Sequence, residues 1–395
     1  MHTTVFARVL YDGRERREGV LVRMEDDRIA EVREGTEEQA DLSGVVTPGF
    51  IDAHSHIGMI RQGEPQSEAD VNDQIDQITP LNDPMNAIYW DDRGLAEAVD
   101  FGVLYSCVVP GSGNLLGGRA RVIRHFAANR EEGLFRDYGY KMALGYNPKS
   151  TQSWKGTRPT TRMGAYAHLE KRFDEVLQKE GKARASLEKA LADAGDDGRA
   201  RARAERTYEL ELSTEEKALL QILRGEKTVK CHAHKEDDLL YLIELKRRYG
   251  IRFTAEHTCD VHHVEIYDRL AEEGIPVVYG PLGSLDYKVE LKNASYRHAR
   301  VIMDSKATFG LMTDHPVILS SALRDSLKYF LIAGMSETDA INLITRRNAE
   351  ILGIDDELGT VETGKLASLV VWDGDPLVLA AFPTAVFAEG RRIRG

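Results

Sequence analysis

Short apolar segments of strand type alternate with amphipathic, helix-type segments through most of this chain, and this alternation restricts the fold more than any other feature. Strands that alternate with helices favour a parallel sheet, and eight of them suggest a closed (β/α)8 (TIM) barrel of the α/β class. The predicted strands are 49–54, 102–109, 121–123, 138–144, 229–232, 252–257, 276–279 and 308–314. The segment 121–123 is the shortest of them.

The two ends of the chain have a different pattern. Residues 20–24 and 28–32 form β-type runs around a polar turn, and residues 366–372 and 385–392 look similar. Because chain termini often lie close together, these runs can pair into one small domain. We therefore expect a small β-sandwich domain from residues 1–47 and 350–395, and a barrel from residues 48–349.

Residues 165–226 are rich in alternating acidic and basic side chains. Such a pattern is typical of exposed helices with ion pairs between successive turns. We interpret this stretch as a charged helical insertion in the barrel. A lid or dimerisation arm over the barrel mouth is the functional alternative.

Composition excludes several classes of function. The net charge of −12 argues against affinity for nucleic acid or an anionic membrane. The three cysteines contain no CxxC pair, which fits a reducing compartment. With no signal-peptide pattern at the start and no apolar run of membrane-spanning length, we expect a cytoplasmic protein. Its expected partners are a small-molecule substrate and, as a homo-oligomer, further copies of itself.

Five polar side chains stand where predicted strands end. His54 and His56 close the first strand, and His232, His257 and Asp314 close later ones. In a parallel barrel these positions share the carboxyl-terminal rim, where barrel enzymes place their active sites. Singly, a histidine there is usually structural and an aspartate usually caps the next helix. Together, five imidazole and carboxylate groups predict a divalent metal; we expect zinc, and iron and manganese accept the same ligands.

At these residues the sequence resembles the amidohydrolase superfamily. Residues 48–56 (PGFIDAHSH) are similar to its first-strand signature, and residues 358–373 (LGTVETGKLASLVVWD) to its return into the small domain. Residues 141–149 (KMALGYNPK), 223–238 (LRGEKTVKCHAHKEDD) and 313–318 (TDHPVI) resemble blocks of the imidazolonepropionase-related branch, a largely uncharacterised subgroup.

The resemblance implies roles for the matched residues. His54 and His56 would bind the more buried metal, with Asp314 as shared ligand and general base. His232 and His257 would bind a second metal or, around one ion, supply a ligand and a catalytic hydrogen-bonding group. Lys141, on the predicted fourth strand, would be carboxylated by CO₂ and bridge two ions; its ordinary alternative is an ion pair. One or two ions per chain are therefore expected.

The reaction predicted from this site is hydrolysis of a C–N bond in an amide or cyclic amide. Metal-activated hydroxide would attack, and Asp314 would accept and return the proton. The alternative is a deaminase of a heterocycle, in which Glu236 would be the acid, although a carboxylate there also suits a helix start. A catalytically inactive scaffold is the third possibility. Loss of metal ligands would favour it, but all five His and Asp residues are present.

Four further residues are candidate substrate contacts. They are His234, Asn114, Tyr146 and Arg119. His234 follows His232 by two positions, and Asn114 lies in the glycine-rich stretch GSGNLLGG, which lacks the context of a dinucleotide-binding fingerprint. Arg119 could bind a substrate carboxylate through its fork of donors, although a surface ion pair is its ordinary role.

Overall fold

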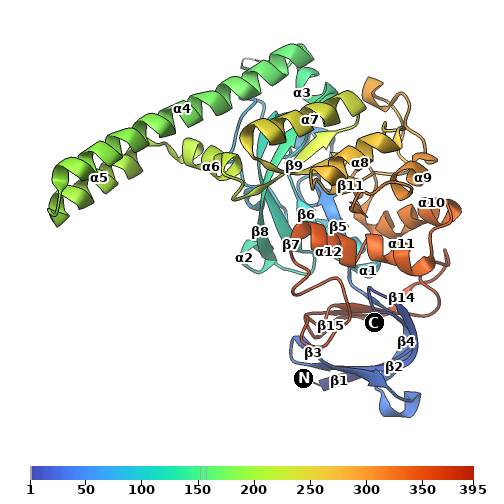
Figure 1. Ribbon diagram of the computed structural model, residues 1–395. Helices are drawn as coiled ribbons and strands as arrows, with labels where there is room; N and C mark the ends of the chain where they lie inside the picture. Colours follow the sequence, from blue (N-terminus) through green and yellow to red (C-terminus); the bar gives the residue numbers. More distant parts are fainter. Residues whose placement is uncertain (1, 152, 157) are drawn as a thin grey trace.

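Two sheets organise the computed structural model, which describes residues 2–151, 153–156 and 158–395. The larger sheet has eight strands in the order β12-β11-β10-β9-β8-β7-β6-β5, and helices cover its outer side (Figure 1). Its strands are β5 (Phe50–Ser55), β6 (Val103–Val108), β7 (Leu116–Arg124), β8 (Leu134–Ala143), β9 (Thr228–Ala233), β10 (Arg252–His257), β11 (Val277–Tyr279) and β12 (Phe309–Leu311). The predicted α/β barrel with a small terminal domain is confirmed.

The barrel closes between β12 and β5 through a side chain. The amide Nδ2 of Asn348, on helix α12 (Arg346–Leu352), donates to the carbonyls of Ile51 and Leu311 at 2.6 and 2.8 Å. Farther along, the backbone N of Asp314 donates to the carbonyl of His54 at 3.1 Å. Closure therefore brings the end of β12 directly beside the end of β5.

One barrel strand departs from the expected parallel arrangement. Strand β7 pairs antiparallel with both β6 and β8, whereas the other neighbours in the sheet are parallel. Residues 109–115 connect β6 to β7, and this connection is too short for a helical crossover, which takes about a dozen residues or more. The strand predicted at 121–123 therefore exists, but it is longer and runs in the opposite direction.

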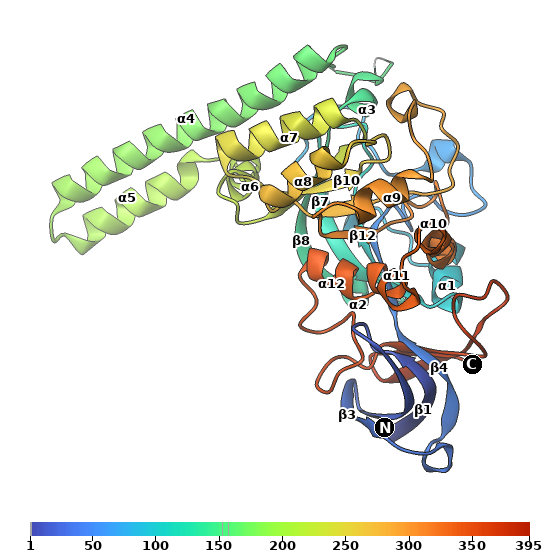
Figure 2. The ribbon, with the colours of Figure 1, turned by 45° about the vertical axis from the view of Figure 1, so that its right-hand side comes forward.

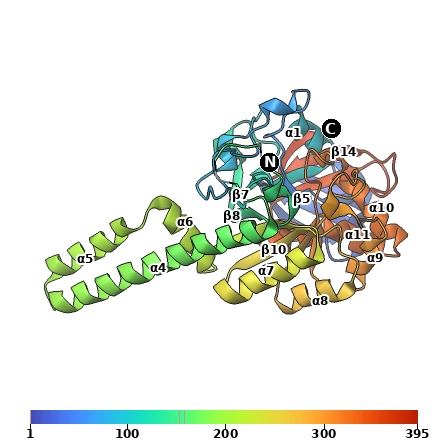
Figure 3. The same cartoon turned by 90° about the horizontal axis from the view of Figure 1, so that it is seen from above.

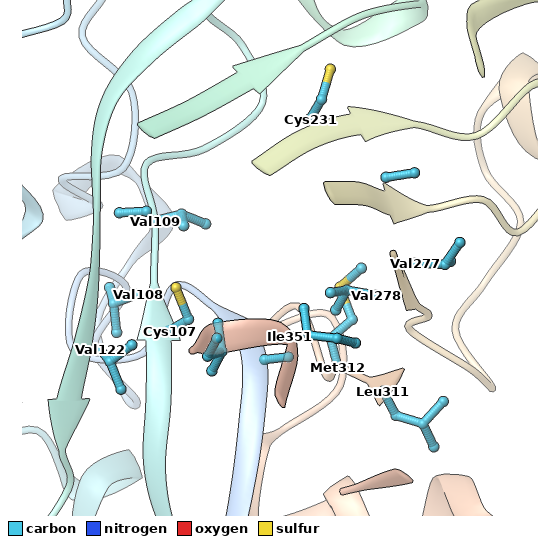
Figure 4. Packing of buried hydrophobic residues seen from close by; sticks show 14 of the residues in the cluster. Cys107, Val108, Val109, Val122, Cys231, Val277, Val278, Leu311, Met312 and Ile351 are labelled. Carbon is cyan, nitrogen blue, oxygen red and sulfur yellow. The ribbon is translucent and has the colours of Figure 1, made fainter. Parts of the chain in front are cut away.

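Apolar side chains fill the space between the strands and the surrounding helices. Figure 4 shows Cys107, Val278 and Met312 packed among neighbouring strands, and all three are fully buried. Charged residues are also buried, notably Lys230 and Glu256 on β9 and β10. Because buried charges are stable only when paired, these residues direct attention to the site described below.

The outer layer of the barrel is helical. It contains α1 (Arg93–Asp100), α2 (Arg130–Gly133), α3 (Tyr146–Lys149), α7 (Glu236–Tyr249), α8 (Val264–Glu272), α9 (His298–Met303), α10 (Leu327–Ile332), α11 (Glu337–Leu343) and α12. Among the described helices, none combines the length and the apolar character that a membrane span requires.

The second sheet combines the two chain ends. Its order is β15-β14-β13-β4-β1-β2-β3, and it curls around its own core below the barrel (Figure 1). The strands are β1 (His2–Tyr11), β2 (Arg16–Glu25), β3 (Arg28–Glu34), β4 (Leu42–Pro48), β13 (Leu369–Trp372), β14 (Pro383–Ala388) and β15 (Arg391–Arg394). Strand β4 leads directly into β5, so this sheet anchors the first strand of the site.

The charged stretch forms α4 (Arg162–Ala194), α5 (Gly198–Glu211) and α6 (Thr214–Leu223). The first part of α4 packs on α7, where the rings of Tyr166 and Tyr241 stack at 3.7 Å. Its second part and α5 form a hairpin that projects from the body (Figures 2 and 3). Helix α5 has no buried residue. We call this projecting hairpin, residues 183–211, the arm.

Candidate metal and active site

The ends of β5, β9, β10 and β12 bring six side chains into one cluster. They are His54, His56, His232, His234, His257 and Asp314. Metal-ligating atoms lie within 4.8 Å of one another in two sets. The first set is His54, His257 and Asp314, and the second is His232, His234 and His257. His257 belongs to both sets, so it lies at the centre of the cluster.

The two imidazoles at the end of β5, His54 and His56, each have Nδ1 in contact with an acceptor on the side away from the cluster. Nδ1 of His54 lies 2.8 Å from Oε2 of Glu256, and Nδ1 of His56 lies 2.7 Å from the carbonyl of Val109. Nδ1 of His257 likewise lies 3.1 Å from the carbonyl of Gly280. Such contacts fix the tautomer and aim Nε2 inward, as outer partners do around metal-binding histidines.

The inward nitrogens fit a metal ion. Nε2 of His54 and of His257, and Nδ1 of His234, are buried and lack a hydrogen-bond partner among the described residues. A buried polar atom without a partner costs about 1–3 kcal/mol, so such atoms rarely gather in one place without a purpose. Imidazole nitrogens beside a carboxylate are the donor set that zinc and related ions prefer.

Electrostatics favours the ligand form of these groups. Burial lowers the pKa values of His54, His232, His234 and His257 well below the usual range, so the imidazoles are neutral. Burial alone would raise the pKa of Asp314, but hydrogen bonding from His56 and the nearby charges lower it. The carboxylate is therefore ionised, with Oδ1 at 3.1 Å from Nε2 of His56.

The backbone is unusual at two of these residues. His257 has φ = 75° and Asp314 has φ = 52°, and Thr258 follows His257 with φ = 55°. Non-glycine residues rarely adopt these left-handed conformations, and a β-branched residue such as threonine does so least. Backbone strain of this kind gathers at functional sites, where it holds side chains in place.

Lys141 lies beside the cluster on β8. Its side chain is fully buried, and Nζ donates to Oγ of Ser112 at 2.7 Å. The same Oγ lies 3.1 Å from Nδ1 of His232. Burial lowers the pKa of Lys141 to about 8. The predicted bridging lysine is therefore adjacent to His232, and the β6–β7 connection supplies the link between them.

Of the predicted substrate contacts, His234 belongs to the cluster and Tyr146 lies at its border. His234 is one of the six clustered side chains, and Tyr146 begins α3, where its backbone N donates to Oε2 of Glu290 at 3.0 Å. Next to it, Nδ2 of Asn147 lies 3.3 Å from Nε2 of His232. The start of α3 therefore borders the site.

The structure places the other two predicted contacts elsewhere. Nδ2 of Asn114 donates to the carbonyls of Asp73 and Asp76, so this amide holds two loops together. Arg119 lies over the ring of Tyr140, whose hydroxyl donates to Gln221 on the outer side of the barrel. Arg119 is paired with Tyr140, the residue before Lys141 on β8. Because side chains alternate along a strand, Arg119 and Lys141 project to opposite sides of the sheet.

Three buried charged residues escaped the sequence prediction. Nζ of Lys230 lies 3.0 Å from Glu256, which in turn contacts His54. Oε1 of Glu290, in the 3₁₀ turn Val289–Leu291, lies 3.3 Å from Nε2 of His232. The sequence did carry a signal for Lys230 and Glu256. Each is a charged residue within a predicted barrel strand, and each stands one or two residues before a predicted ligand. Glu290 belongs to an irregular loop that gave none.

A third group of potential ligands, Glu236, His262 and His263, lies near the surface. Oε1 of Glu236 accepts hydrogen bonds from the backbone N of both histidines at 3.0 Å. This carboxylate therefore secures the segment that leads into α8. It does not line the cavity at the cluster.

A cavity of about 260 Å³ adjoins the cluster, and its wall includes His234 and Asp314. The remaining wall comes from Cys259, from Tyr279 of β11 and the segment after it, from Val317, and from Tyr329 on α10. A substrate in this cavity would contact the clustered side chains directly.

Comparisons with known proteins agree with this geometry. Residues 205–393 match the amidohydrolase family. The amidohydrolase tasK of Hapsidospora irregularis is 27% identical over 361 residues, 87% of this chain, but the chain spans only 36% of that relative. The crystal structure of an amidohydrolase from Thermotoga maritima superposes with a TM-score of 0.88 and 28% identity, covering 99% of both chains.

A Xaa-Pro dipeptidase with methionine bound in its active site shares the fold with a TM-score of 0.59 and 16% identity, over 100% of both chains. The sequence motifs, the barrel with its strand-end histidines and aspartate, and these similarities together show that the chain belongs to the amidohydrolase superfamily.

Proposed function

We propose that the protein is a metal-dependent hydrolase of a C–N bond in an amide or cyclic amide. The observation that carries this proposal is a pair of buried Nε2 atoms, of His54 and His257, beside the carboxylate of Asp314. Neither nitrogen has a hydrogen-bond partner among the described residues. The family match supports an amide-type bond. Membership of the imidazolonepropionase-related branch is proposed on the sequence motifs.

The clustered side chains would hold one or two divalent ions, and we propose zinc. His54, His56 and Asp314 would bind one ion, with His232, His234 and His257 available for a second. When bound, such an ion lowers the pKa of a water molecule from about 15.7 toward about 7 and polarises the carbonyl to be attacked.

Asp314 is the proton acceptor in this proposal. Its carboxylate is ionised and Oδ1 lies 3.1 Å from Nε2 of His56, so it can take the proton of the attacking water. The oxygen adds to the carbonyl carbon, the C–N bond breaks, and Asp314 returns the proton to the leaving nitrogen. The products are a carboxylic acid and an amine.

We propose that Lys141 is carboxylated and bridges two ions. This reaction requires a neutral amine, and a lysine with a pKa of about 8 is neutral in about a tenth of molecules at pH 7. Ser112 already orients Nζ toward His232. A ¹³C NMR signal after addition of ¹³C-bicarbonate, absent in Lys141→Met, is the expected result.

The deaminase alternative receives less support from the geometry. It assigns the acid role to Glu236, but that carboxylate accepts hydrogen bonds at the start of the segment before α8. Both readings need the metal, so substrate class separates them: amide hydrolysis releases an amine and a carboxylate, whereas deamination releases ammonia.

Metal removal tests the proposal. The purified protein is treated with a chelator, dialysed, and reloaded with Zn²⁺, Mn²⁺ or Fe²⁺, and amide and cyclic amide panels are assayed at each stage. We expect activity to disappear with the metal and to return with it. Activity that survives complete metal removal, or a protein that binds no divalent ion, would overturn the proposal.

A further inference from the structure

Aromatic and apolar side chains form about half of the wall of the cavity beside His234 and Asp314, and polar groups form the rest. The loop that follows β11 supplies most of the lining residues, and helix α10 contributes Tyr329. The apolar lining residues are Tyr279, Pro281, Leu282, Tyr287, Leu291, Tyr296, Val317 and Tyr329. The rings of Tyr296 and Tyr329 lie 6.2 Å apart, centroid to centroid. The four tyrosines and four apolar side chains of this set provide a surface for a bulky apolar or aromatic group.

The loop that follows β11 also exposes apolar side chains, and those of Tyr287 and Tyr296 line the cavity. Leu285, Tyr287, Val289 and Tyr296, all from one short segment, are respectively 79%, 65%, 60% and 49% exposed. Soluble proteins rarely gather large apolar side chains on the surface without a ligand for them. Because the adjoining cavity reaches Asp314, the ligand that fits this surface best is the substrate itself.

Cations accompany the rings. Nζ of Lys288 lies 5.2 Å from the ring centroid of Tyr287, and the guanidinium of Arg297 lies 5.7 Å from that of Tyr296. Nζ of Lys328 is similarly placed over Tyr329 at 5.0 Å. Of these three cations, Lys288 is the one that lines the cavity among the described residues.

Lys288 is the one cation among the described residues that line the cavity, where the exposed Asp286 is also present. Its Nζ lies 3.6 Å from Oε1 of Glu290, which is beside His232. The ammonium is thus anchored between the aromatic wall and the clustered histidines. A carboxylate of the substrate could meet it there through a charge-assisted hydrogen bond.

We propose that this cavity binds the part of an amide substrate that carries an aromatic or bulky apolar side chain next to a free carboxylate, and that Lys288 contacts that carboxylate. The inference rests on the proposed function and names its substrate class: N-acyl or peptide-like derivatives of apolar amino acids. Water adds to the acyl carbon, the C–N bond breaks, and the amino acid leaves with the returned proton on its nitrogen.

Three matched substrates test the two halves of this specificity. Acetate release by the metal-loaded enzyme is measured with N-acetyl-L-phenylalanine, N-acetyl-L-alanine and N-acetyl-L-phenylalanine amide. We expect kcat/KM to be highest for the first and lower by about tenfold or more for each of the others. Equal kcat/KM values for the phenylalanine and alanine derivatives would overturn the assignment of an aromatic side chain to the cavity. Equal kcat/KM values for the acid and the amide would overturn the assignment of the carboxylate to Lys288.

Variants locate the contacts. Lys288→Met should raise KM for the acid by about tenfold while leaving kcat/KM for the amide near its wild-type value. Tyr296→Ser should reduce the ratio of kcat/KM for the phenylalanine derivative to kcat/KM for the alanine derivative. The controls are Lys292→Met, an exposed lysine of the same segment that does not line the cavity, and Tyr208→Ser on α5. Equal effects in a variant and its control would overturn the assignment.

A binding measurement separates this inference from the proposed function. Calorimetry with L-phenylalanine and L-alanine, added to metal-loaded protein, requires no turnover. If no amide is hydrolysed, the proposed function fails, but tighter binding of L-phenylalanine that Lys288→Met abolishes would still support the cavity assignment. Absence of any such preference, together with no aromatic preference in turnover, would overturn it.

Discussion

Nδ1 of His54 lies 2.8 Å from Oε2 of Glu256, and both side chains are completely buried. Lys230 lies 3.0 Å from the same carboxylate, and Thr254 also donates to it. The charge of Glu256 is therefore balanced on one side, while its other oxygen fixes the ring of His54. Because Nδ1 is engaged, only Nε2 of His54 is left for a metal ion.

Substitution of Glu256 should weaken metal binding. In Glu256→Gln with Lys230→Met, which avoids an unpaired buried lysine, His54 loses its carboxylate acceptor, and we expect the affinity for Zn²⁺ to fall by about 10–100-fold. Titration against a chelator of known affinity measures it. Glu236→Gln, whose carboxylate caps a surface segment, is the control, and a double variant with wild-type affinity would contradict the positioning role of Glu256.

Removal of a metal-binding histidine should lower the metal content of the protein, whereas removal of a structural histidine should not. We expect His54→Ala to contain less metal than the wild type, whereas His125→Ala and His168→Ala keep the wild-type content. His125 contacts Val103, the first residue of β6, and so lies at the opposite end of the barrel; His168 is on α4. Elemental analysis of purified proteins decides this, and equal metal contents would show that the strand-end cluster is not the site.

Asp314→Asn should separate binding from turnover. The amide keeps the shape of the side chain but cannot accept the proton of the attacking water, so we expect most of the metal to remain while kcat falls by about 10²–10⁴-fold. Metal content and initial rates are measured on the same preparation. A variant that retains wild-type kcat would remove Asp314 as the general base.

The sequence predicted most of this arrangement because strand ends are a repeated signal. His54, His232, His257 and Asp314 each end an apolar run, and a parallel barrel must bring such positions to one rim. The direction of β7 was not predictable from its own residues, because an antiparallel strand has the same alternation as a parallel one. The shortness of the β6–β7 connection was the informative feature.

Other parts of the site depend on contacts that no local pattern encodes. Glu290 reaches His232 from an irregular loop, across 58 residues of sequence. Asn114 looked like a cleft residue because it follows glycines, yet its amide bonds to carbonyls about 40 residues earlier in the chain. Long-range packing, not residue type, decides which polar side chains of a loop face the substrate.

Acid should destabilise the fold through buried histidines, and His125 allows one contribution to be isolated. Burial lowers its pKa from the model-compound value of 6.5 to about 3. The unfolded chain therefore binds the proton first, so this contribution to stability is complete above pH 6.5 and is lost as the pH falls toward 3. At pH 5 the loss amounts to about 2 kcal/mol.

Urea unfolding at pH 7.5 and pH 5 tests this expectation. The wild type and His125→Gln share the other buried histidines, whose effects therefore cancel in the comparison. Between the two pH values the free energy of unfolding should fall by about 2 kcal/mol more in the wild type than in His125→Gln. Equal losses in the two proteins would mean that His125 is protonated normally in the folded state.

The arm should be dispensable for the barrel and for metal binding. Residues 185–203 contain no buried side chain, and the hairpin stands away from the body in Figure 3. Replacing them with a short glycine-serine turn removes no core contact, so we expect a change in unfolding free energy of less than about 1 kcal/mol and an unchanged metal content. A large loss of stability or metal would show that the arm supports the barrel. Light scattering on the same samples tests the expected homo-oligomer, and a mass that falls to a single chain on truncation would assign the contact between copies to the arm.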